Sequence, residues 1–503
     1  MPHLSIVHSR GQAGIDSPYV TIETHITGGL PALSIVGLPE TAVRESRDRV
    51  RSALLNCQFD FPVRRITVNL APADTPKEGG RFDLPIAIGI LAATQQLSTT
   101  ALKQLPHYEL AGELALSGRL RPVKGILPFA LATRKAKRTL IIPEHNGAEA
   151  SLVQDLTVLP AHHLLDVCAH LNDTKSIQPS APCAAQPTPP EALDLRDVQG
   201  QYQARRALEI AAAGGHSLLF IGPPGSGKTM LASRLPSILP PLTTEESLEI
   251  AAVQSISRNG FYRQPGLQRP FRSPHHSTSA IALVGGSNPP YPGEISLAHH
   301  GVLFLDEVPQ FNRHVLETLR EPLESKTITV SRAAHQVDFP ANFQLVVAMN
   351  PCPCGYFGDP KRDCRCTQEQ IKNYCGRISG PLMDRIDLHV NVPSVPKHVF
   401  MQAKQAQVES SHTVRTRVIT ARAQQLQRQE TINAQLTVQQ LNQLGKLDPA
   451  QQRWLHETID RLNLSARAYH RILKVARTIA DLGHESHIGQ HHLAEAISYR
   501  TLD

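Results

Sequence analysis

Short apolar runs alternate with helical stretches through the middle of the chain. The runs Leu218–Ile221, Val302–Leu305 and 345–349 are continuous and bounded by polar residues, which is typical of strands buried in a parallel sheet. Residues 193–213 precede the first run and predict a helix. From about Pro396 onward the pattern is helical, with few glycines and many Gln, Ala, Leu and Arg residues. We expect an α/β domain with a parallel sheet, followed by a helical domain.

The N-terminal part mixes short strands with helices and predicts an α+β domain. Residues 65–70 alternate as a strand does, and residues 41–55 predict a helix. Residues 176–190 are rich in Pro, Ala, Ser and Gln without a periodicity that could bury a face, so they predict a linker. The expected segments are an α+β domain (1–172), a linker (173–192), an α/β domain (193–395) with a Cys-rich insert (352–375), and a helical domain (396–503).

Composition limits the class of protein. Of the 503 residues, 41% are hydrophobic and 19% charged, as in globular proteins. The formal net charge of +7 permits a polyanionic partner without requiring one. The first residues do not resemble a secretory signal, and the longest apolar stretch, residues 86–93, is far shorter than the roughly 20 residues that span a bilayer. We expect a cytoplasmic protein without a membrane partner.

The first apolar run leads directly into the glycine-rich loop Gly222-Pro223-Pro224-Gly225-Ser226-Gly227-Lys228-Thr229. This is the pattern G-x-x-x-x-G-K-[ST] in its required context, between a buried strand and a helix. Glycines let backbone N–H groups turn toward a polyphosphate, and the helix adds the positive end of its dipole. Lys228 can then reach the β- and γ-phosphates, while the Thr229 hydroxyl can bind Mg²⁺. The loop predicts a site for a nucleoside triphosphate, ATP, with Mg²⁺.

Two further strands end in residues suited to ATP hydrolysis. The run Val302–Leu305 is followed by Asp306 and Glu307. We expect Asp306 to hold the Mg²⁺ shell and Glu307 to polarise the attacking water. The strand at 345–349 is followed by Asn350, which is placed to sense the γ-phosphate or orient the water; a plain strand-end asparagine is the alternative.

The order of these residues is similar to that of AAA+ ATPases, with Asp306-Glu307 as Walker B, Asn350 as sensor 1, Arg385 as arginine finger and Arg467 as sensor 2. The blocks PHHSTS (274–279), PGEISLAH (292–299) and MNPCPCG (349–355) resemble the magnesium chelatase-like YifB/ComM family, and this resemblance covers nearly the whole chain. It implies a ring, usually a hexamer, with ATP between subunits and Arg385 reaching a neighbour's γ-phosphate. Arg377 is an alternative for that role, and Arg471 is the alternative for sensor 2.

The N-terminal domain resembles the proteolytic domain of Lon-type proteases, through residues 76–80 (PKEGG) and 112–122. Those enzymes need a serine nucleophile and a lysine base. Arg81 stands where the resemblance places the serine. Leu127 stands where it places the lysine, and Lys124 lies nearby in the sequence. We expect a domain without protease activity that serves as a scaffold, an assembly surface or a DNA-contacting ring.

Five of the eight cysteines lie within residues 352–375. Four of them form two C-x-C pairs: Cys352, Cys354, Cys364 and Cys366. Four thiolates can hold Zn²⁺ in a closed tetrahedral site, although paired ligands usually have two to four residues between them. Reduced cysteines without a metal are the alternative, and Cys375 could replace one ligand. We expect a structural zinc site in the loop between sensor 1 and the arginine finger.

Residues 327–339 predict a hairpin with a basic tip at Arg332. In helicases of the related AAA+ clade such a hairpin faces the pore and grips the DNA backbone; a surface hairpin is the alternative. The resemblance implies a DNA translocase or helicase for branch migration on single-stranded or branched DNA in natural transformation. A metal-chelatase motor subunit, a protein-remodelling ATPase and an ATP-gated scaffold remain as alternatives.

Overall fold

The computed structural model describes residues 4–74, 77–181, 193–261, 268–287, 290–332, 335–359, 361–395, 408–462 and 464–500. The chain forms two compact units. The first contains Met1–Thr188, Ser247–Leu267 and His335–Asp338, and the second contains Pro189–Glu246, Gln268–Ala334 and Phe339–Asp503. Within the described ranges, every helix is too short or too polar to cross a membrane. Part of the expected linker (182–192) and the expected start of the helical domain (396) lie outside the described residues, so those boundaries stay predictions.

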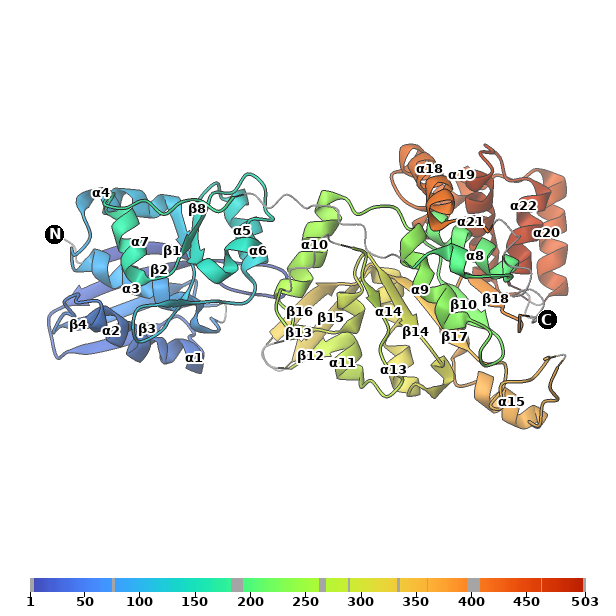
Figure 1. Ribbon diagram of the computed structural model, residues 1–503, viewed down its shortest axis with the longest axis horizontal. Helices are drawn as coiled ribbons and strands as arrows, with labels where there is room; N and C mark the ends of the chain where they lie inside the picture. Colours follow the sequence, from blue (N-terminus) through green and yellow to red (C-terminus); the bar gives the residue numbers. More distant parts are fainter. Residues whose placement is uncertain are drawn as a thin grey trace. The chain divides into compact units, whose positions relative to one another are not determined.

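The first unit contains a four-stranded sheet in the order β1-β2-β4-β3 (Figure 1). β1, β2 and β4 are antiparallel neighbours, whereas β3 runs parallel to β4. Burial alternates along β2 and β4, and α3, whose residues are all buried, contacts β1 and β2. The predicted strand at 65–70 is therefore confirmed. The elements are β1 (Leu4–Arg10), β2 (Tyr19–Thr27), β3 (Ala32–Val36), β4 (Arg65–Ala71) and α3 (Asp83–Ala93).

The helix predicted over residues 41–55 is interrupted once. It forms α1 (Thr41–Arg44) and α2 (Ser46–Asn56), and Glu45 between them keeps right-handed helical dihedral angles, so the departure is local. The rest of the unit adds a parallel sheet in the order β5-β8-β9 and a two-stranded sheet. Their elements are α4 (Thr99–Gln104), β5 (Tyr108–Leu110), β6 (Glu113–Leu114), β7 (Leu120–Arg121), α5 (Ile126–Lys135), β8 (Thr139–Pro143), α6 (Gly147–Ala150), β9 (Val158–Ala161) and α7 (Leu164–Leu171).

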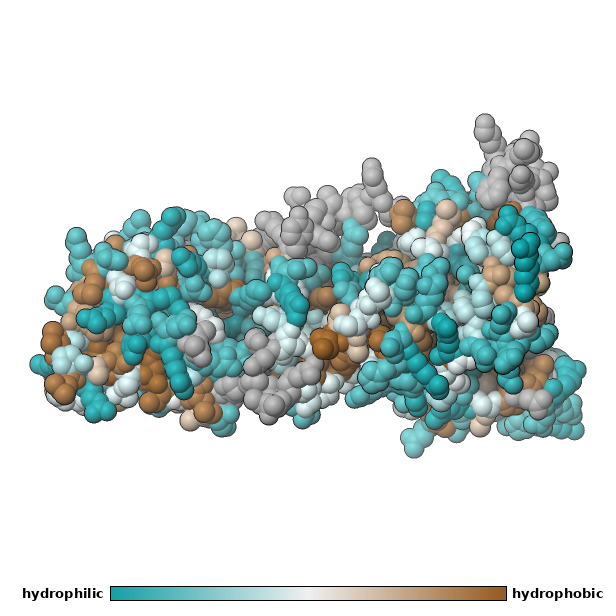
Figure 2. All heavy atoms as spheres, turned by 90° about the horizontal axis from the view of Figure 1, so that it is seen from below, coloured by the Kyte–Doolittle hydropathy of each residue, from teal (hydrophilic) through white to brown (hydrophobic). Residues whose placement is uncertain are grey.

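β3 forms an open edge of the four-stranded sheet, because it pairs with β4 on one side only in the described part of the chain. Large apolar side chains are exposed near it, including Leu30 at 88% and Leu38 at 60%, and Val63 is exposed at 80%. Brown, hydrophobic spheres gather over this unit, on the left of Figure 2. Apolar patches on an exposed sheet edge are unusual for a surface that stays in contact with water.

The second unit contains a five-stranded parallel sheet in the order β11-β14-β17-β10-β18. β10 lies between β17 and β18, and β14 is the other neighbour of β17. The apolar runs predicted as buried strands form β10, β14 and β17, which confirms the expected parallel α/β sheet. The strands are β10 (Leu218–Ile221), β11 (Phe271–Arg272), β14 (Val302–Leu305), β17 (Gln344–Met349) and β18 (Leu388–Asn391).

Helices α8 (Tyr202–Gly214) and α9 (Lys228–Ile238) pack against this sheet and against each other (Figure 1). Between the strands lie α10 (Thr244–Ser255), α11 (Ala280–Val284), β12 (Gly285–Gly286), β13 (Tyr291–Pro292), α12 (Glu294–Leu297), α13 (Arg313–Glu317), α14 (Arg320–Ser325), β15 (Thr327–Arg332), β16 (His335–Pro340), α15 (Gln368–Cys375) and α16 (Gly380–Met383).

The C-terminal region is helical, as predicted. α18 contacts α8 and α9, and α21 contacts α8. Apolar residues of these helices share one core with residues of the sheet. The helices are α18 (Ser411–Gln429), α19 (Val438–Leu444), α20 (Pro449–Arg461), α21 (Ala466–Leu482) and α22 (Gln490–Ser498).

A buried carboxylate, Asp387, ties α21 to the edge of the sheet where β10 and β18 begin. Its Oδ2 accepts a hydrogen bond of 3.0 Å from the Ser217 N–H, and its Oδ1 accepts one from Arg471. His216 lies 3.5 Å from the same carboxylate. Burial by itself would raise the pKa of Asp387, but Arg471, His216 and the Ser217 N–H together hold that pKa well below its usual range.

We predict that Asp387→Ala lowers the free energy of unfolding of the second unit by about 3 kcal/mol, because it leaves the Arg471 charge without its partner. In the wild type this contribution is present above the ordinary carboxyl pKa, near pH 4, and is lost as the pH falls through the lower folded-state pKa. Chemical denaturation measures both effects. Asp384→Ala, three residues away and outside this network, should have little effect; equal losses in the two variants would contradict the prediction.

Candidate nucleotide site

The phosphate loop joins the end of β10 to the start of α9. Gly225 and Gly227 have φ values of +75° and +94°, and a Cβ added at either position would meet nothing within 4 Å. Backbone conformation, and not space, therefore favours glycine at these two positions. At Gly222 the reason is different, since a Cβ there would lie 2.1 Å from the carbonyl oxygen of Val392. The loop ends at the N-terminus of α9. Backbone N–H groups and the positive end of a helix dipole at such a position can bind an anion.

Lys228 lies at the first position of α9 and is buried. Its Nζ donates to the carbonyl oxygens of Gly222 (2.8 Å) and Pro223 (2.9 Å) and to Oδ1 of Asn350 (3.0 Å). Burial lowers the pKa of Lys228, while the nearby carboxylates of Asp306 and Glu307 act to raise it. All three acceptors are neutral oxygens, so the ammonium charge remains available to a triphosphate.

The next residue, Thr229, meets the Walker B aspartate. Its Oγ1 donates to Oδ2 of Asp306 at 2.7 Å. A hydroxyl and a carboxylate oxygen are ligands that Mg²⁺ accepts, and they lie where they could share one ion. Glu307 follows with left-handed dihedral angles, φ 50° and ψ 44°, and its N–H donates to Oδ1 of Asp306 at 2.9 Å. This unusual conformation turns the chain sharply at the residue expected to activate water.

Strand order explains why these residues meet. β17 lies between β10 and β14, and all three strands run in the same direction. The residues that follow them, Gly222, Asp306 and Asn350, therefore lie at one edge of the sheet. Ser226 Oγ is buried in the same loop and lacks a hydrogen-bond partner in the described part of the chain. The structure thus brings together the predicted Walker A, Walker B and sensor 1 residues in a form that fits a metal-bound triphosphate.

Arg385 lies at the opposite edge of the sheet. It precedes β18, which pairs in parallel with β10, whereas the phosphate loop follows β10. A four-residue strand spans roughly 13 Å, so Arg385 is separated from the phosphate loop of its own chain by at least that distance. Its Nη2 lies 2.6 Å from Oε1 of Glu324, and its Nη1 donates to the Pro381 carbonyl at 2.8 Å. Its side chain is 9% exposed.

The sensor 2 candidates are on α21. Arg467 is exposed in the first turn of that helix. Arg471, one turn later, donates to the Arg385 carbonyl at 2.9 Å and to Asp387. Arg471 therefore has a role within the fold, and Arg467 lies near the same edge of the sheet as Arg385.

Arg377, the alternative to Arg385, is exposed and donates to the Pro309 carbonyl at 3.1 Å. It lines a cavity of about 940 Å³ together with His276, Thr278 and Arg313. The cavity therefore includes part of the family block at 274–279, and two arginines line it.

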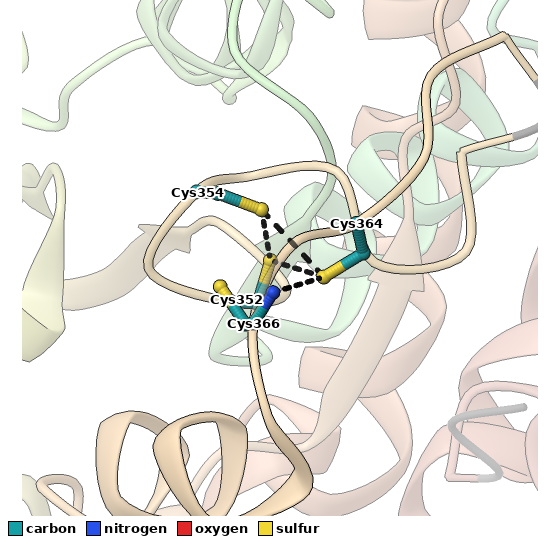
Figure 3. A group of neighbouring side chains, drawn as sticks. All are labelled: Cys352, Cys354, Cys364 and Cys366. Atoms are coloured by element: carbon teal, nitrogen blue, oxygen red, sulfur yellow. Dashed lines mark hydrogen bonds between the residues drawn. The ribbon is translucent and has the colours of Figure 1, made fainter.

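The four cysteines of the C-x-C pairs converge, as Figure 3 shows. Their sulfurs all lie within 4.8 Å of one another. Cys352 Sγ is 3.3 Å from Cys354 Sγ, and Cys364 Sγ is 3.6 Å from each of these two. Four thiolates around zinc at about 2.3 Å would be roughly 3.8 Å apart, which is close to these separations. The cluster therefore fits a tetrahedral metal site, despite the tight C-x-C spacing.

Backbone N–H groups also point at the sulfurs. The N–H groups of Gly355 and Phe357 donate to Cys352 Sγ at 3.2 and 3.3 Å. The backbone groups of Tyr356 and Arg365 lower the pKa of Cys354 to about 6, whereas desolvation and the neighbouring Cys354 and Cys352 raise the pKa of Cys364 to about 12. Cys375 is exposed, its Sγ donates to the Pro351 carbonyl, and it is not among the four grouped sulfurs.

Sequence analysis did not identify two residues that border the nucleotide site. Tyr374, on α15, interacts through its hydroxyl with the backbone N–H of Asn350, and burial raises its pKa to about 12. Gly355 has a φ of +87°, and a Cβ there would lie 2.6 Å from Cδ of Pro224 in the phosphate loop. Neither contact has a sequence signal, because both depend on how the cysteine loop folds back.

In the first unit, Arg81 fills the position expected for a protease serine. It is buried, and its guanidinium donates to Gln12 Oε1, to the Lys124 carbonyl (2.9 Å) and to the Gly11 carbonyl (3.4 Å). Burial lowers the pKa of Arg81 to about 10. Leu127 is also buried, and Lys124 Nζ donates to the Arg258 carbonyl at 2.9 Å.

The predicted hairpin is present as the two-stranded sheet of β15 and β16. At its base the Ala341 N–H donates to the Lys326 carbonyl at 2.7 Å. Residues 333–334 and the side chain of Arg332 lie outside the described residues, so the DNA-contact role of Arg332 stays a prediction.

Comparisons with known proteins agree with this architecture. The family described as magnesium chelatase, subunit ChlI, matches residues 194–400, and its C-terminal model matches residues 408–500. The model described as subunit ChlI of Mg-chelatase matches residues 22–146. The competence protein ComM of Haemophilus influenzae is 51% identical over 99% of this chain and 98% of its own length. Protein YifB of Salmonella typhimurium is 50% identical over 99% of this chain and 97% of its own.

A weaker similarity, 23% identity over an alignment of 183 residues, covers 34% of this chain and 22% of the Lon protease of Roseiflexus castenholzii. This is consistent with the Lon-like fold expected for part of the chain.

The parallel sheet, the phosphate loop and the Walker B strand define a P-loop ATPase of the AAA+ class. The chain belongs to the YifB/ComM family of magnesium chelatase-like AAA+ proteins. Membership implies an ATPase that uses ATP and Mg²⁺.

We predict that Lys228→Ala abolishes ATP binding, because it removes the buried cation next to the phosphates. Fluorescence titration with an ATP analogue measures the affinity. Lys372→Ala, an exposed cation of the same unit, is the control and should bind normally. Unchanged affinity in Lys228→Ala would show that the loop does not hold the triphosphate.

Proposed function

We propose that copies of this chain form a ring, hydrolyse ATP between neighbouring subunits and use the energy to move along DNA. The observation that carries the proposal is the distribution of catalytic groups over the sheet. Lys228, Asp306 and Asn350 lie at one edge, whereas Arg385 precedes β18 at the other. One chain therefore cannot complete its own site, and a second copy could supply the missing arginine. Arg467, near the same edge as Arg385, would face the neighbour's nucleotide too.

The ATP site needs Mg²⁺, which Thr229 and Asp306 would hold. The ion supplies charge neutralisation for the transferred phosphoryl group. Lys228 would bind the β- and γ-phosphates, Asn350 would orient the attacking water, and Glu307 would accept its proton. A neighbour's Arg385 would stabilise the charge that develops on the γ-phosphate, after leaving its pair with Glu324.

DNA is the proposed substrate of the movement. A relative that shares 51% identity over the whole chain is named competence protein ComM, and the chain has a net charge of +7. The hairpin of β15 and β16 has a basic residue, Arg332, at the end of β15, and it would be the element of the ring that contacts DNA. A helicase or branch-migration role on single-stranded or branched DNA, in natural transformation, agrees with these features. Such a ring is expected to be hexameric, and the activity to be cytoplasmic.

A metal-chelatase motor subunit is the second candidate. The specific observation in its favour is the match of three family models described as magnesium chelatase subunit ChlI. We rank it second because the relatives that match nearly the whole chain at about 50% identity are named YifB and ComM. Stimulation of ATP hydrolysis by DNA separates the two candidates, since a chelatase motor would respond to its partner subunit and a porphyrin.

Zn²⁺ is proposed as a structural ion of the second unit. Cys352, Cys354, Cys364 and Cys366 would hold it as thiolates, in agreement with the separations of their sulfurs. The ion would cross-link two ends of a loop that otherwise makes few buried contacts.

We predict that DNA increases the ATPase rate, with branched or single-stranded DNA more effective than duplex. Binding should weaken with salt, with a slope of roughly −0.7 per neutralised phosphate on single strands. ATP hydrolysis and fluorescence anisotropy at several salt concentrations measure the two effects. A rate that is indifferent to every DNA form, or an affinity that is indifferent to salt, would remove DNA as the substrate.

We also predict that Arg385→Ala binds ATP but hydrolyses it roughly 10³–10⁵ times more slowly. Mixed with Lys228→Ala, it should regain activity, because interfaces form that pair an intact loop with an intact arginine. In a random equimolar ring roughly a quarter of the interfaces would be of this kind. Glu324→Ala, which removes only the partner of Arg385, is the control and should remain active. Failure of the mixture to recover activity would argue against catalysis between subunits.

A further inference from the structure

We infer that the cysteine loop, residues 351–375, is a positioning element of the ATP site, and that ATP turnover depends on a metal ion held by its four thiolates. The inference rests on the ATPase activity and the zinc site proposed above. It assigns to the metal a role in catalysis that acts through other residues, without contact with the nucleotide. Three contacts between the loop and the nucleotide site carry it.

The first contact is along the chain. Asn350 accepts a hydrogen bond from Lys228 Nζ, and only Pro351 separates Asn350 from the buried ligand Cys352. Two residues span at most about 7 Å of chain, and proline restricts the backbone between them. The position of the Cys352 sulfur therefore limits where the Asn350 amide can lie.

The second contact joins the loop to the phosphate loop. Gly355 donates its N–H to Cys352 Sγ at 3.2 Å, and it packs so closely on Pro224 that a Cβ would lie 2.6 Å from Cδ of that proline. One residue therefore touches both a metal ligand and the loop that surrounds the phosphates. Movement of the cysteine sulfurs would therefore shift Gly355, which packs against Pro224.

The third contact comes from the other end of the cluster. Thr367, directly after the ligand Cys366, caps α15 with a capping box shared with Gln370. The cluster thereby fixes where α15 begins. Tyr374, near the end of this helix, lies with its hydroxyl next to the N–H of Asn350. A metal ion that links Cys352 to Cys366 would fix the chain next to Asn350 and the start of α15 relative to each other.

These contacts predict which kinetic constant depends on the metal. ATP is bound mainly by the N–H groups of the phosphate loop and by Lys228, which the cysteine loop supports through the contact of Gly355 with Pro224. Asn350 and Glu307 act on the attacking water, and their alignment is what the loop supports. Loss of the metal should therefore lower kcat more than it raises KM, since small misplacements of catalytic groups are costly in rate.

The chain offers a matched pair of glycines for the test. Gly355 and Gly358 lie in the same loop with φ values of +87° and +76°, but a Cβ at Gly358 would meet nothing within 4 Å. Gly355→Ala should keep its zinc, lower kcat roughly 10- to 100-fold and weaken the affinity for a fluorescent ATP analogue. Gly358→Ala carries the same backbone strain and should retain both values. Equal kcat and equal affinity in the two variants would overturn the inference.

A second pair keeps the test valid if Gly355→Ala does not fold. Tyr374→Phe removes only the hydroxyl that meets Asn350, whereas Tyr356→Phe removes one that accepts from Arg362 Nη1 at 2.7 Å. Both should hold one zinc per chain and melt at similar temperatures. A lower kcat in Tyr374→Phe alone supports the inference, and equal kcat values contradict it.

Metal removal is the direct experiment. The full chain is stripped with a chelator, its zinc content is measured, and ATP hydrolysis without DNA is followed before and after ZnCl₂ is added. We expect kcat to fall on removal and to return on addition.

The double variant Cys364→Ser/Cys366→Ser should lack zinc and stay slow, whereas Cys375→Ser should behave as the wild type. Zinc-free protein with full turnover would refute the role of the metal. Absence of DNA stimulation would affect only the proposed function, because these measurements use basal hydrolysis and nucleotide affinity.

Discussion

Parallel pairing of β10 with β17 on one side and β18 on the other decides which side chains can act together. Residues that follow parallel strands share one edge of a sheet, and residues that precede them share the opposite edge. The phosphate loop, Asp306 and Asn350 belong to the first group. Asp387 and Arg385 belong to the second, together with the Arg471 side chain that binds them. The proposed groups of the hydrolytic site are thus divided between the two edges within a single chain.

The same geometry explains how the fold stabilises each half. At the phosphate edge, the Lys228 ammonium donates hydrogen bonds to neutral oxygens in the described part of the chain, and the carboxylates of Asp306 and Glu307 lie nearby. At the other edge, charged groups are paired: Asp387 with Arg471, and Arg385 with Glu324. A paired arginine is held in place in the free chain, and its release depends on a stronger anion such as a phosphate. In the proposed ring, a neighbour's triphosphate would be the anion that competes with Glu324 for Arg385.

Local chemistry made much of this predictable from the sequence. A continuous apolar run before a glycine-rich loop fits few structures other than a strand followed by a phosphate loop. The strands β10 and β14 and the grouping of the two C-x-C pairs were predicted from the sequence. Regions where several distant segments meet could not be anticipated in the same way. The contact of Gly355 with Pro224 depends on a positive φ and on how the loop returns to the site. The pairing of Arg385 with Glu324 joins two exposed-looking residues from separate elements, and neither has a periodic pattern that marks it.

The guanidinium of Arg81 limits which side chains the first unit can accept at that position. Its hydrogen bonds satisfy oxygens of Gly11, Gln12 and Lys124 in the interior of the domain. Putting a serine back at that position would remove the donors for all three and leave a hollow the size of a long side chain. The lysine base would still be missing, since Leu127 is buried in the core. A serine and a lysine base would both have to be introduced at positions that buried side chains now fill before the expected dyad could form.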